Sequence, residues 1–330
     1  MTPIIGISAG DPAGIGLEVT VKALPQFLGA ARYVLFTDRL HFERSRFGDL
    51  RFRWISGLTE VTDEPLLFLI DVPGASAPIP WGEPSLRSGN RARACLEAAS
   101  DAAVQGAIDA IVTAPVSKAA IGPEFKGQTE FLAARSGVAQ FAMAFFAPTF
   151  KVVLATVHLP LRNALAAIST KQYTELIPFV HREMHRFGFE NPRIAIAAIN
   201  PHAGEGGMFG SEDMEILQPA VRACAALGIP VSGPHSADSL YYRAHSGEFD
   251  VVIAPYHDQG LIPVKLIAHR DSTNVTLGLP YIRTSPDHGT AFQIAGKNIA
   301  DATGMASAIR CALDLLHRQA RQSRQSRQTP

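Results

Sequence analysis

Short, wholly apolar runs recur along this chain, and each stops abruptly at a polar turn. The clearest is Val251–Ala254, which ends at Pro255 and leads directly to His257 and Asp258. A strand that is apolar on both faces is typical of a parallel sheet that helices cover on both sides. Because ligands in such sheets bind beyond the carboxyl ends of the strands, we expect His257 to lie where chemistry takes place.

Two further apolar runs also end close to a histidine. Lys151–Val157 is followed by His158, and Arg193–Ile199 is followed by an Asn-Pro-His sequence that ends at His202. Three imidazoles with an open coordination position form a common site for a catalytic divalent metal. None of these histidines has the local spacing of a metal motif, so each can equally be an ordinary loop or capping histidine. A shared metal site is therefore a hypothesis beside that simpler interpretation.

Strand-like and helix-like segments alternate along most of the chain. Apolar runs predict strands at residues 3–8, 33–37, 66–70 and 107–114, and helical patterns cover residues 17–24, 85–105, 170–187, 211–227 and 300–317. This alternation predicts an α/β fold with a mainly parallel sheet. Residues 44–62 are more polar and irregular. We expect two interleaved lobes with an active-site cleft between them: residues 1–124 with 286–330, and residues 125–285.

Composition excludes several classes of protein. The net charge is zero and 47% of the residues are hydrophobic, which favours a globular enzyme over a partner of nucleic acid or membrane. No apolar run approaches membrane-spanning length, and the first residues do not resemble a signal peptide. Three widely separated cysteines in helical patterns indicate reduced thiols and a cytoplasmic location. The Arg/Gln/Ser-rich end, from His317, is expected to be a solvated helix end or a disordered tail.

A glycine-rich turn, residues 9–16, joins the first predicted strand to the first predicted helix. Its glycines are spaced G-x-x-x-G-x-G, which matches neither the dinucleotide fingerprint nor the phosphate-binding P-loop. The turn can serve close packing of helix and strand, or it can line an active-site crevice.

Several cationic and polar side chains are candidates for binding an anion. Lys265 and Arg283 lie in or near the His257 segment, and together with Asn274 they suggest a phosphate or carboxylate site, to which Lys118 can also contribute. Each lysine or arginine alone is typically a solvated surface cation. Asp238 can be a catalytic base, a group that orients a metal ligand, or a helix N-cap. We expect His288 to be a pocket or structural histidine.

Longer motifs resemble those of the 4-hydroxythreonine-4-phosphate dehydrogenase family. They run in order along nearly the whole chain, apart from residues 39–84 and the tail. The motifs are SAGDPAGIGLE (Ser8–Glu18), TAPVSK (Thr113–Lys118), GQTEFLA (Gly127–Ala133), ATVHLPLR (Ala155–Arg162), NPHAGEGGMFGSE (Asn200–Glu212), a GP-x-x-AD stretch ending at Asp238, YHDQGLIPVK (Tyr256–Lys265) and NVTLGLPYIRTSPDHGTAFQIAGK (Asn274–Lys297).

The resemblance implies a fold like that of isocitrate and isopropylmalate dehydrogenases, and a homodimer with a shared active site. It implies NAD, possibly NADP, as cofactor and one divalent ion (Zn, Mg or Co) bound by His158, His202 and His257, with one ligand from the partner subunit. The substrate-binding residues that it implies are Gln128, Thr129, Lys265, Asn274 and Arg283, and the catalytic residues are Asp238 and Lys265. The family's usual GHTE is GQTE in this chain, and glutamine carries no charge.

The activity implied is oxidation of 4-phosphooxy-L-threonine at its 3-hydroxyl, followed by decarboxylation to 3-amino-2-oxopropyl phosphate for pyridoxal phosphate synthesis. Gln128 raises a first alternative, a sister dehydrogenase acting on 4-phosphoerythronate, 4-phosphothreonate or a related diol acid. A second alternative, of another class, is a metal-dependent hydrolase or lyase in which three histidines bind an ion that activates water.

Overall fold

The computed structural model describes residues 2–45, 50–74 and 77–328. The chain divides into two compact units, Met1–Phe141 with Thr273–His317 (unit 1) and Ala142–Ser272 with Arg318–Pro330 (unit 2). Unit 2 is thus an insertion in unit 1. The boundaries differ from the expected ones, because residues 125–141 and 273–285 pack with unit 1. The helix and the two strands in these segments join the core and the sheet of that unit.

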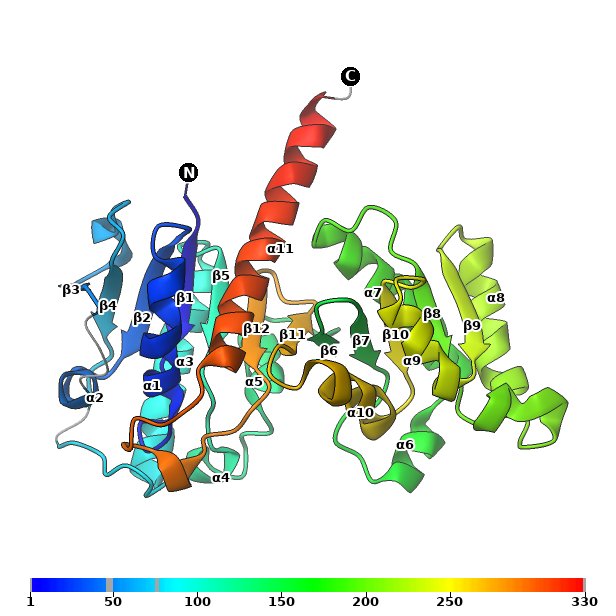
Figure 1. Cartoon of the computed structure of the whole chain (residues 1–330), viewed down its shortest axis with the longest axis horizontal. Helices are drawn as coiled ribbons and strands as arrows, with labels where there is room; N and C mark the ends of the chain where they lie inside the picture. The colour runs from blue at the N-terminus through cyan, green and yellow to red at the C-terminus, as the bar shows by residue number, and fades with distance from the viewer. Residues whose placement is uncertain (1, 46–49, 75–76, 329–330) are drawn as a thin grey trace. The chain divides into compact units, whose positions relative to one another are not determined.

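Unit 1 is built on strands ordered β3-β4-β2-β1-β5-β12-β11. The strands are β1 (Ile4–Ser8), β2 (Arg32–Thr37), β3 (Phe52–Ile55), β4 (Leu67–Asp71), β5 (Ala110–Thr113), β11 (Thr273–Leu277) and β12 (Ile282–Pro286). All neighbours pair in parallel except β11 and β12, which are antiparallel. Strand β12 pairs with β5, so a segment late in the sequence lies beside one from its first third (Figure 1).

Helices cover both faces of the unit 1 sheet. They are α1 (Gly16–Ala23), α2 (Arg39–Ser45), α3 (Leu86–Val104), α4 (Lys118–Ile121), α5 (Gln128–Arg135) and α11 (Thr303–Gln328), with short 3-10 turns at Leu24–Phe27, Leu58–Glu60 and Phe292–Ile294. Helices α1 and α11 lie on one face and α3 on the other (Figure 1). Ser85 begins α3 with a capping box, in which its hydroxyl accepts from the Ser88 amide and the Ser88 hydroxyl accepts from the Ser85 amide.

Unit 2 repeats this architecture with strands ordered β6-β7-β10-β8-β9. They are β6 (Ala142–Phe146), β7 (Lys151–Leu154), β8 (Ile194–Ala197), β9 (Val231–His235) and β10 (Val251–Ala254), and only the β6–β7 pair is antiparallel. The helices are α6 (Leu161–Ala167), α7 (Thr170–Arg186), α8 (Gln218–Ala226), α9 (Ala237–His245) and α10 (His257–Ala268), with η3 (Pro201–Gly207) and a π-helical turn, Asp213–Leu217, before α8. The three histidine-bearing segments expected after parallel strands follow β7, β8 and β10.

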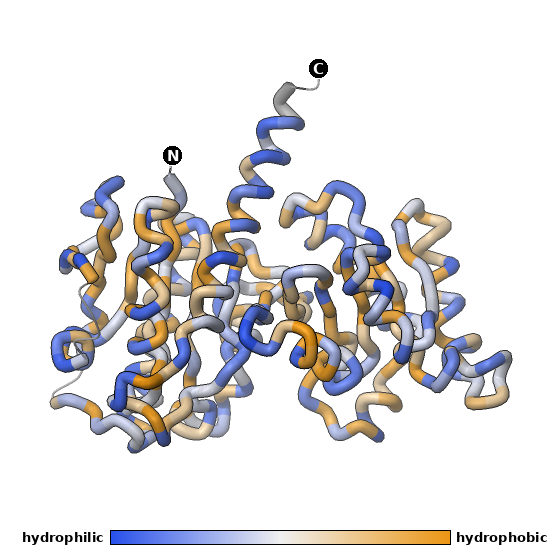
Figure 2. The backbone as a smooth tube through the Cα atoms, viewed as in Figure 1, coloured by the Kyte–Doolittle hydropathy of each residue, from blue (hydrophilic) through white to orange (hydrophobic). Residues whose placement is uncertain are grey.

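Two segments differ from their sequence-based expectation. The region expected to be irregular, residues 44–62, contains the end of α2, the edge strand β3 and the 3-10 turn Leu58–Glu60. Lys265 lies in α10, a helix that is not among those predicted from helical patterns. Leu261, Val264 and Ala268 are buried at helical spacing while Leu266 is 84% exposed, so a helix buries one apolar face where a strand would not. Of the two expectations for the segment from His317, the structure has the solvated helix end: α11 runs to Gln328, and its last turns are mostly hydrophilic (Figure 2).

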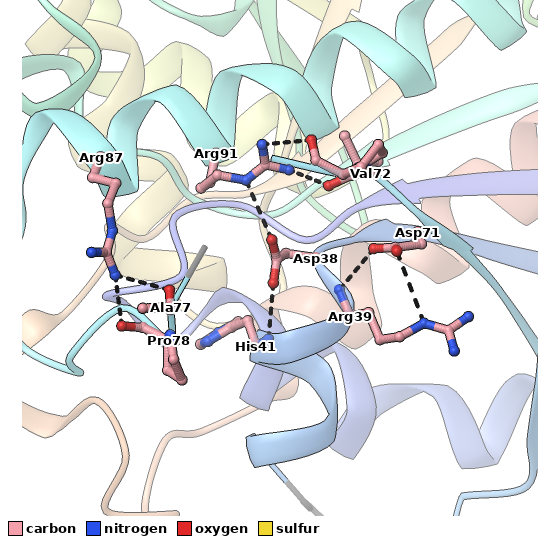
Figure 3. Close-up of polar contacts among 10 residues, drawn as sticks. Asp38, Arg39, His41, Asp71, Val72, Ala77, Pro78, Arg87 and Arg91 are labelled. Carbon is pink, nitrogen blue, oxygen red and sulfur yellow. Dashed lines mark hydrogen bonds and ion pairs between the residues drawn. The ribbon is translucent and has the colours of Figure 1, made fainter. Parts of the chain in front are cut away.

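Three arginines, Arg44, Arg87 and Arg91, bind backbone carbonyls of residues 72–73 and 77–79, between β4 and α3; Figure 3 shows the contacts of Arg87 and Arg91. Arg91 donates to the Val72 and Pro73 carbonyls, Arg87 to those of Ala77 and Pro78, and Arg44 to that of Ile79. Beside this arginine clamp, the buried Arg91 also pairs with Asp38 at 3.4 Å. Guanidinium groups with several donors suit this task, because the segment has no ladder or helix to satisfy its carbonyls.

Candidate active site

In unit 1, Arg283 is the centre of a buried polar cluster. It lies on β12 and is only 3% exposed. Its Nε and Nη2 donate to Thr113 Oγ1 at 3.2 and 2.7 Å, and Nη2 also donates to Gln128 Oε1 at 3.1 Å. Its Nη1 donates to Asn274 Oδ1 and to Thr276 Oγ1, both at 3.2 Å. The cluster therefore joins the end of β5, the start of α5 and β11 around one guanidinium.

Arg283 is an uncommon buried cation, because its partners are neutral. Burial lowers the pKa of the guanidinium to about 10, opposed by the charges of Tyr281 and Glu130. Among the ion pairs of residues 2–45, 50–74 and 77–328, none involves Arg283. Because a buried charge is normally matched by an opposite one, a positive group surrounded by hydroxyl and amide dipoles favours binding of an anion.

The structure brings together three of the expected substrate-binding residues, Gln128, Asn274 and Arg283, and places a fourth, Thr129, nearby. Thr129 Oγ1 lies 3.4 Å from Thr276 Oγ1. Sequence reasoning missed Thr113 and Thr276 as members of the cluster. The available signal was a threonine inside an apolar strand, where a hydroxyl needs a polar partner.

The glycine-rich turn next to this cluster serves packing. A Cβ at Gly16 would meet the Ala9 carbonyl oxygen at 2.5 Å, and one at Gly14 would meet that of Thr290 at 2.8 Å. The turn also buries Asp11, whose Oδ1 accepts from the Ala13 amide, and desolvation raises the pKa of this carboxyl. Of the two interpretations of the turn, close packing is therefore the one that its geometry supports.

In unit 2, His158 and His257 lie together. Their ring centroids are 5.7 Å apart, and the rings are tilted by 40°. His257 Nδ1 lies 2.8 Å from Asp258 Oδ1. If Nδ1 carries the proton in that hydrogen bond, the lone pair of Nε2 is available to a metal, and a carboxylate in this position is typical behind a ligating histidine.

His202 lies in η3 beside a different group. Its Nδ1 is 4.0 Å from Asp238 Oδ2. Five consecutive residues from His202 to Gly206 have left-handed backbone angles, which is costly for the non-glycine members and typical of functional sites. Within the part of the chain that the structure describes, no group of three or more His, Cys, Asp or Glu side chains could hold a metal ion. The three-histidine metal site stays a prediction.

The remaining candidates lie on helices. Asp238 is the second residue of α9, so Ser236 occupies the N-cap position instead. The Ser236 hydroxyl donates to Asp238 at 2.8 Å, and this hydrogen bond lowers the pKa of the carboxyl. Lys265 is half-buried in α10, and the exposed Lys118 begins α4. His288 lies in unit 1, where its Nδ1 is 3.1 Å from the Gly289 carbonyl oxygen.

An open apolar groove of about 570 Å³ lies between α9 and α10 of unit 2. Asp238 and Asp258 line it together with Tyr242, Ile262 and Leu266. These last three side chains are 75%, 66% and 84% exposed. Large apolar side chains thus lie next to two carboxylates that neighbour the candidate metal ligands.

Comparison with known proteins identifies the family. Residues 30–312 match the family described as pyridoxal phosphate biosynthetic protein PdxA. The chain belongs to this family. A 4-hydroxythreonine-4-phosphate dehydrogenase of Desulfosudis oleivorans is 37% identical over 94% of this chain and 96% of its own length. A D-threonate 4-phosphate dehydrogenase of Salmonella typhimurium is 38% identical over 95% of this chain and 99% of its own.

Solved structures agree with this assignment to the PdxA family. A 4-hydroxythreonine-4-phosphate dehydrogenase from Klebsiella pneumoniae superposes with a TM-score of 0.88 at 37% identity, over 96% of this chain and 98% of that one. An isocitrate dehydrogenase from Methylococcus capsulatus, 15% identical, superposes with a TM-score of 0.51 over 99% and 89%. The expected α/β fold of the isocitrate dehydrogenase type is confirmed. These relatives are named as dehydrogenases, and this PdxA-family chain is a dehydrogenase. The names of the relatives give two different substrates, 4-hydroxythreonine-4-phosphate and D-threonate 4-phosphate.

Proposed function

We propose that this PdxA-family protein is a NAD-dependent, metal-assisted dehydrogenase of a phosphorylated hydroxy acid. Its proposed substrate is 4-phosphooxy-L-threonine, oxidised at the 3-hydroxyl and decarboxylated to 3-amino-2-oxopropyl phosphate for pyridoxal phosphate synthesis. The observation that carries the proposal is the buried Arg283 guanidinium among neutral acceptors, which supplies an anion site. The names of the relatives supply the reaction class.

The donor set in unit 2 fits a divalent ion. His158 and His257 lie within one ion's reach of each other, and Asp258 orients the His257 ring. These two histidines would hold the ion, and we propose that His202 completes the set across a homodimer interface. When bound, such an ion lowers the pKa of an alcohol and polarises a carbonyl, and Zn, Mg and Co all suit this chemistry.

The protein's own residues then have separate tasks. Arg283, with Asn274 and Thr129, holds the anionic end of the substrate and fixes its orientation. We assign Asp238, whose Oδ2 lies 4.0 Å from His202 Nδ1, as the base that accepts the 3-hydroxyl proton, and Lys265 as a proton donor and substrate ligand. When bound, NAD or NADP would supply the acceptor for the hydride that leaves C3.

The oxidation and decarboxylation can be tested directly. Purified protein with NAD, a divalent ion and 4-phosphooxy-L-threonine should produce NADH and carbon dioxide in equal amounts. A hydrolase or lyase would turn over a substrate without nicotinamide. NADH formation that depends on the ion supports the dehydrogenase, and turnover without NAD contradicts it.

A second candidate substrate is D-threonate 4-phosphate, with 4-phosphoerythronate as a close analogue. Relatives named for each substrate are equally similar to this chain, and Gln128 stands where the family's usual motif has histidine. The acids differ at C2, which carries an amine in one and a hydroxyl in the other. Comparing kcat/KM for the three acids in one NADH assay decides between them.

The shared homodimer site can be tested by mixing two inactive variants. If one site takes its histidines from both protomers, a His202→Ala chain and a His257→Ala chain complement each other. An equal mixture should recover about a quarter of the native activity, since half of the random dimers are mixed and each has one intact site. Activity no greater than that of either variant alone contradicts the shared site. Cys95, Cys224 and Cys311 are thiols that form no disulfide bond, which supports the proposed cytoplasmic location. No helix of the described residues could cross a membrane.

A further inference from the structure

The side chain of Gln128 is fully engaged inside the protein. Its Oε1 accepts from Arg283 Nη2 at 3.1 Å, and its Nε2 donates to the Ala114 carbonyl at 3.0 Å. An amide has one acceptor oxygen and one donor nitrogen, so both ends are held at the same time. Gln128 therefore faces the cation as an acceptor and does not offer a positive charge to a ligand.

Arg283, in turn, has no hydrogen left for a ligand. A guanidinium carries five N–H donors, one on Nε and two on each Nη. The Nε hydrogen and one Nη2 hydrogen go to Thr113, the two Nη1 hydrogens go to Asn274 and Thr276, and the second Nη2 hydrogen goes to Gln128. A substrate anion can contact the guanidinium only if one of these acceptors leaves.

The acceptor best able to leave is Gln128. Thr113 belongs to β5, and Asn274 and Thr276 belong to β11, the two strands that flank Arg283 on β12. Their positions are fixed by the sheet ladder. Gln128 instead lies at the first position of the short helix α5, and its side chain is half-buried. A charged acceptor also forms a hydrogen bond about twice as strong as a neutral amide does.

We propose that Gln128 determines specificity as a neutral stand-in for the substrate's anionic group, which displaces the Gln128 oxygen from Arg283 Nη2. The inference rests on the proposed function for the identity of the substrate, but the exchange itself requires only an anion. Carboxylate and phosphate monoester share the chemistry that Nη2 recognises. Gln128 thus competes with the substrate, whereas a direct substrate ligand would help to hold it.

Two substitutions distinguish competition from direct binding. Gln128→Met keeps the length of the side chain but removes its acceptor, so Nη2 becomes available without a competitor. Gln128→Glu places a carboxylate on Nη2 permanently. The matched control is Gln105→Met, which makes the same exchange at the exposed C-terminus of α3.

The measurement is the Kd of inorganic phosphate and, separately, of malonate, by titration calorimetry of the full chain, with KM for 4-phosphooxy-L-threonine alongside. Gln128→Met should tighten binding of one probe about threefold or more, and Gln128→Glu should weaken the same probe about tenfold or more. The responding probe identifies phosphate or carboxylate as the displacing group. Unchanged or weaker binding of both probes by Gln128→Met overturns the proposal.

Calorimetry separates this outcome from failure of the proposed function. If the parent protein oxidises none of the phosphorylated acids, the proposed function fails while the two Kd values still decide the role of Gln128. Thermal unfolding of each variant checks that it is folded. If Gln128→Met does not fold, Gln128→Glu provides the test alone. Its carboxylate must weaken anion binding if it occupies Nη2. Anion binding as tight as in the parent protein overturns the proposal.

Discussion

Arg283 shows how neutral dipoles can hold a charge out of water. Thr113 contributes most to this arrangement, since its single oxygen accepts from both Nε and Nη2. Its hydroxyl is fully buried at the end of β5, where no water replaces it. Removing that oxygen leaves two N–H groups of a buried cation without partners.

Thr113→Val is therefore expected to lower the free energy of unfolding by about 2–4 kcal/mol. Urea unfolding of the variant and parent measures the difference. Thr276→Val, which removes the acceptor of one Arg283 donor and the hydroxyl partner of Thr129, is the graded control and should cost about 1 kcal/mol. Equal effects of the two substitutions would contradict the leading role of Thr113.

His257 is the residue on which the metal assignment is most directly tested. His257→Ala should abolish the bound divalent ion and turnover while leaving the fold intact, as elemental analysis and thermal unfolding can show. Asp258→Asn should weaken the ion about 10–100-fold, since the carboxylate orients the ring. His269→Ala, an exposed histidine just beyond α10, is the control. Unchanged metal content in His257→Ala would remove this residue from the ligand set.

At the scale of elements, α11 joins the two units. Its residues to His317 belong to unit 1 and the rest to unit 2. The later part contacts α7 and the residues that follow it: Gln319 Nε2 donates to the Arg186 carbonyl at 3.0 Å, Gln322 Nε2 lies 3.2 Å from His185 Nε2, and the Arg318 guanidinium lies 4.5 Å from the Phe189 ring centroid. These three partners lie in the last turn of α7 or just beyond it.

Deleting residues 319–330 should leave kcat/KM within about twofold of the parent, because the segment has few apolar contacts to lose. The free energy of unfolding should fall by about 1–2 kcal/mol, because the deletion removes the Gln319 hydrogen bond and the exposed contact of Gln322 with His185. Arg318→Ala in the full-length chain isolates the contact with Phe189. A fall in kcat/KM beyond about tenfold would show that the tail acts on the active site.

The strands that sequence patterns predicted most clearly are those in which every residue had to be apolar. Four-residue strands such as Val251–Ala254 are buried on both faces, so their signal is unambiguous. Helix α10 was not predicted, because the run Leu261–Ala268 is apolar enough to fit either the helical period or the strand period of hydrophobic residues. The contact between Thr113 and Arg283 joins residues 170 positions apart, and local patterning contains no information on such pairs. The resemblance identified most members of the Arg283 cluster, but the contacts within it are visible only in three dimensions.

At the scale of the whole molecule, His41 links stability to pH. It is 4% exposed beside the arginine clamp, and burial, assisted by the charge of Arg44, lowers its pKa from 6.5 to about 4 (Figure 3). The unfolded chain therefore binds a proton that the folded one does not between these pH values. Stability is complete above pH 6.5 and falls as the pH drops toward about 4.

The loss between pH 7 and pH 4 should be on the order of 3 kcal/mol from this residue. His41→Met removes the titrating group at similar volume, so its unfolding free energy should depend less on pH over the same range. Urea unfolding at pH 7, 5.5 and 4.5 provides the comparison. Parallel curves for the variant and the parent would show that His41 does not contribute to the acid sensitivity.

The insertion of unit 2 into unit 1 has a consequence for the order in which the chain is made. All strands of unit 2 precede Thr273, so that unit can complete its sheet while β11 and β12 are still untranslated. Until then the β5 edge, Ala110–Thr113, has no β12 to pair with, and an unpaired apolar edge is a template for association with another chain. A nascent chain released before residue 286 therefore lacks complete protection of that edge, and one released before Arg283 also lacks the proposed anion site. The sheet of unit 1 and the Arg283 cluster can therefore be complete only after translation has reached the last fifth of the sequence.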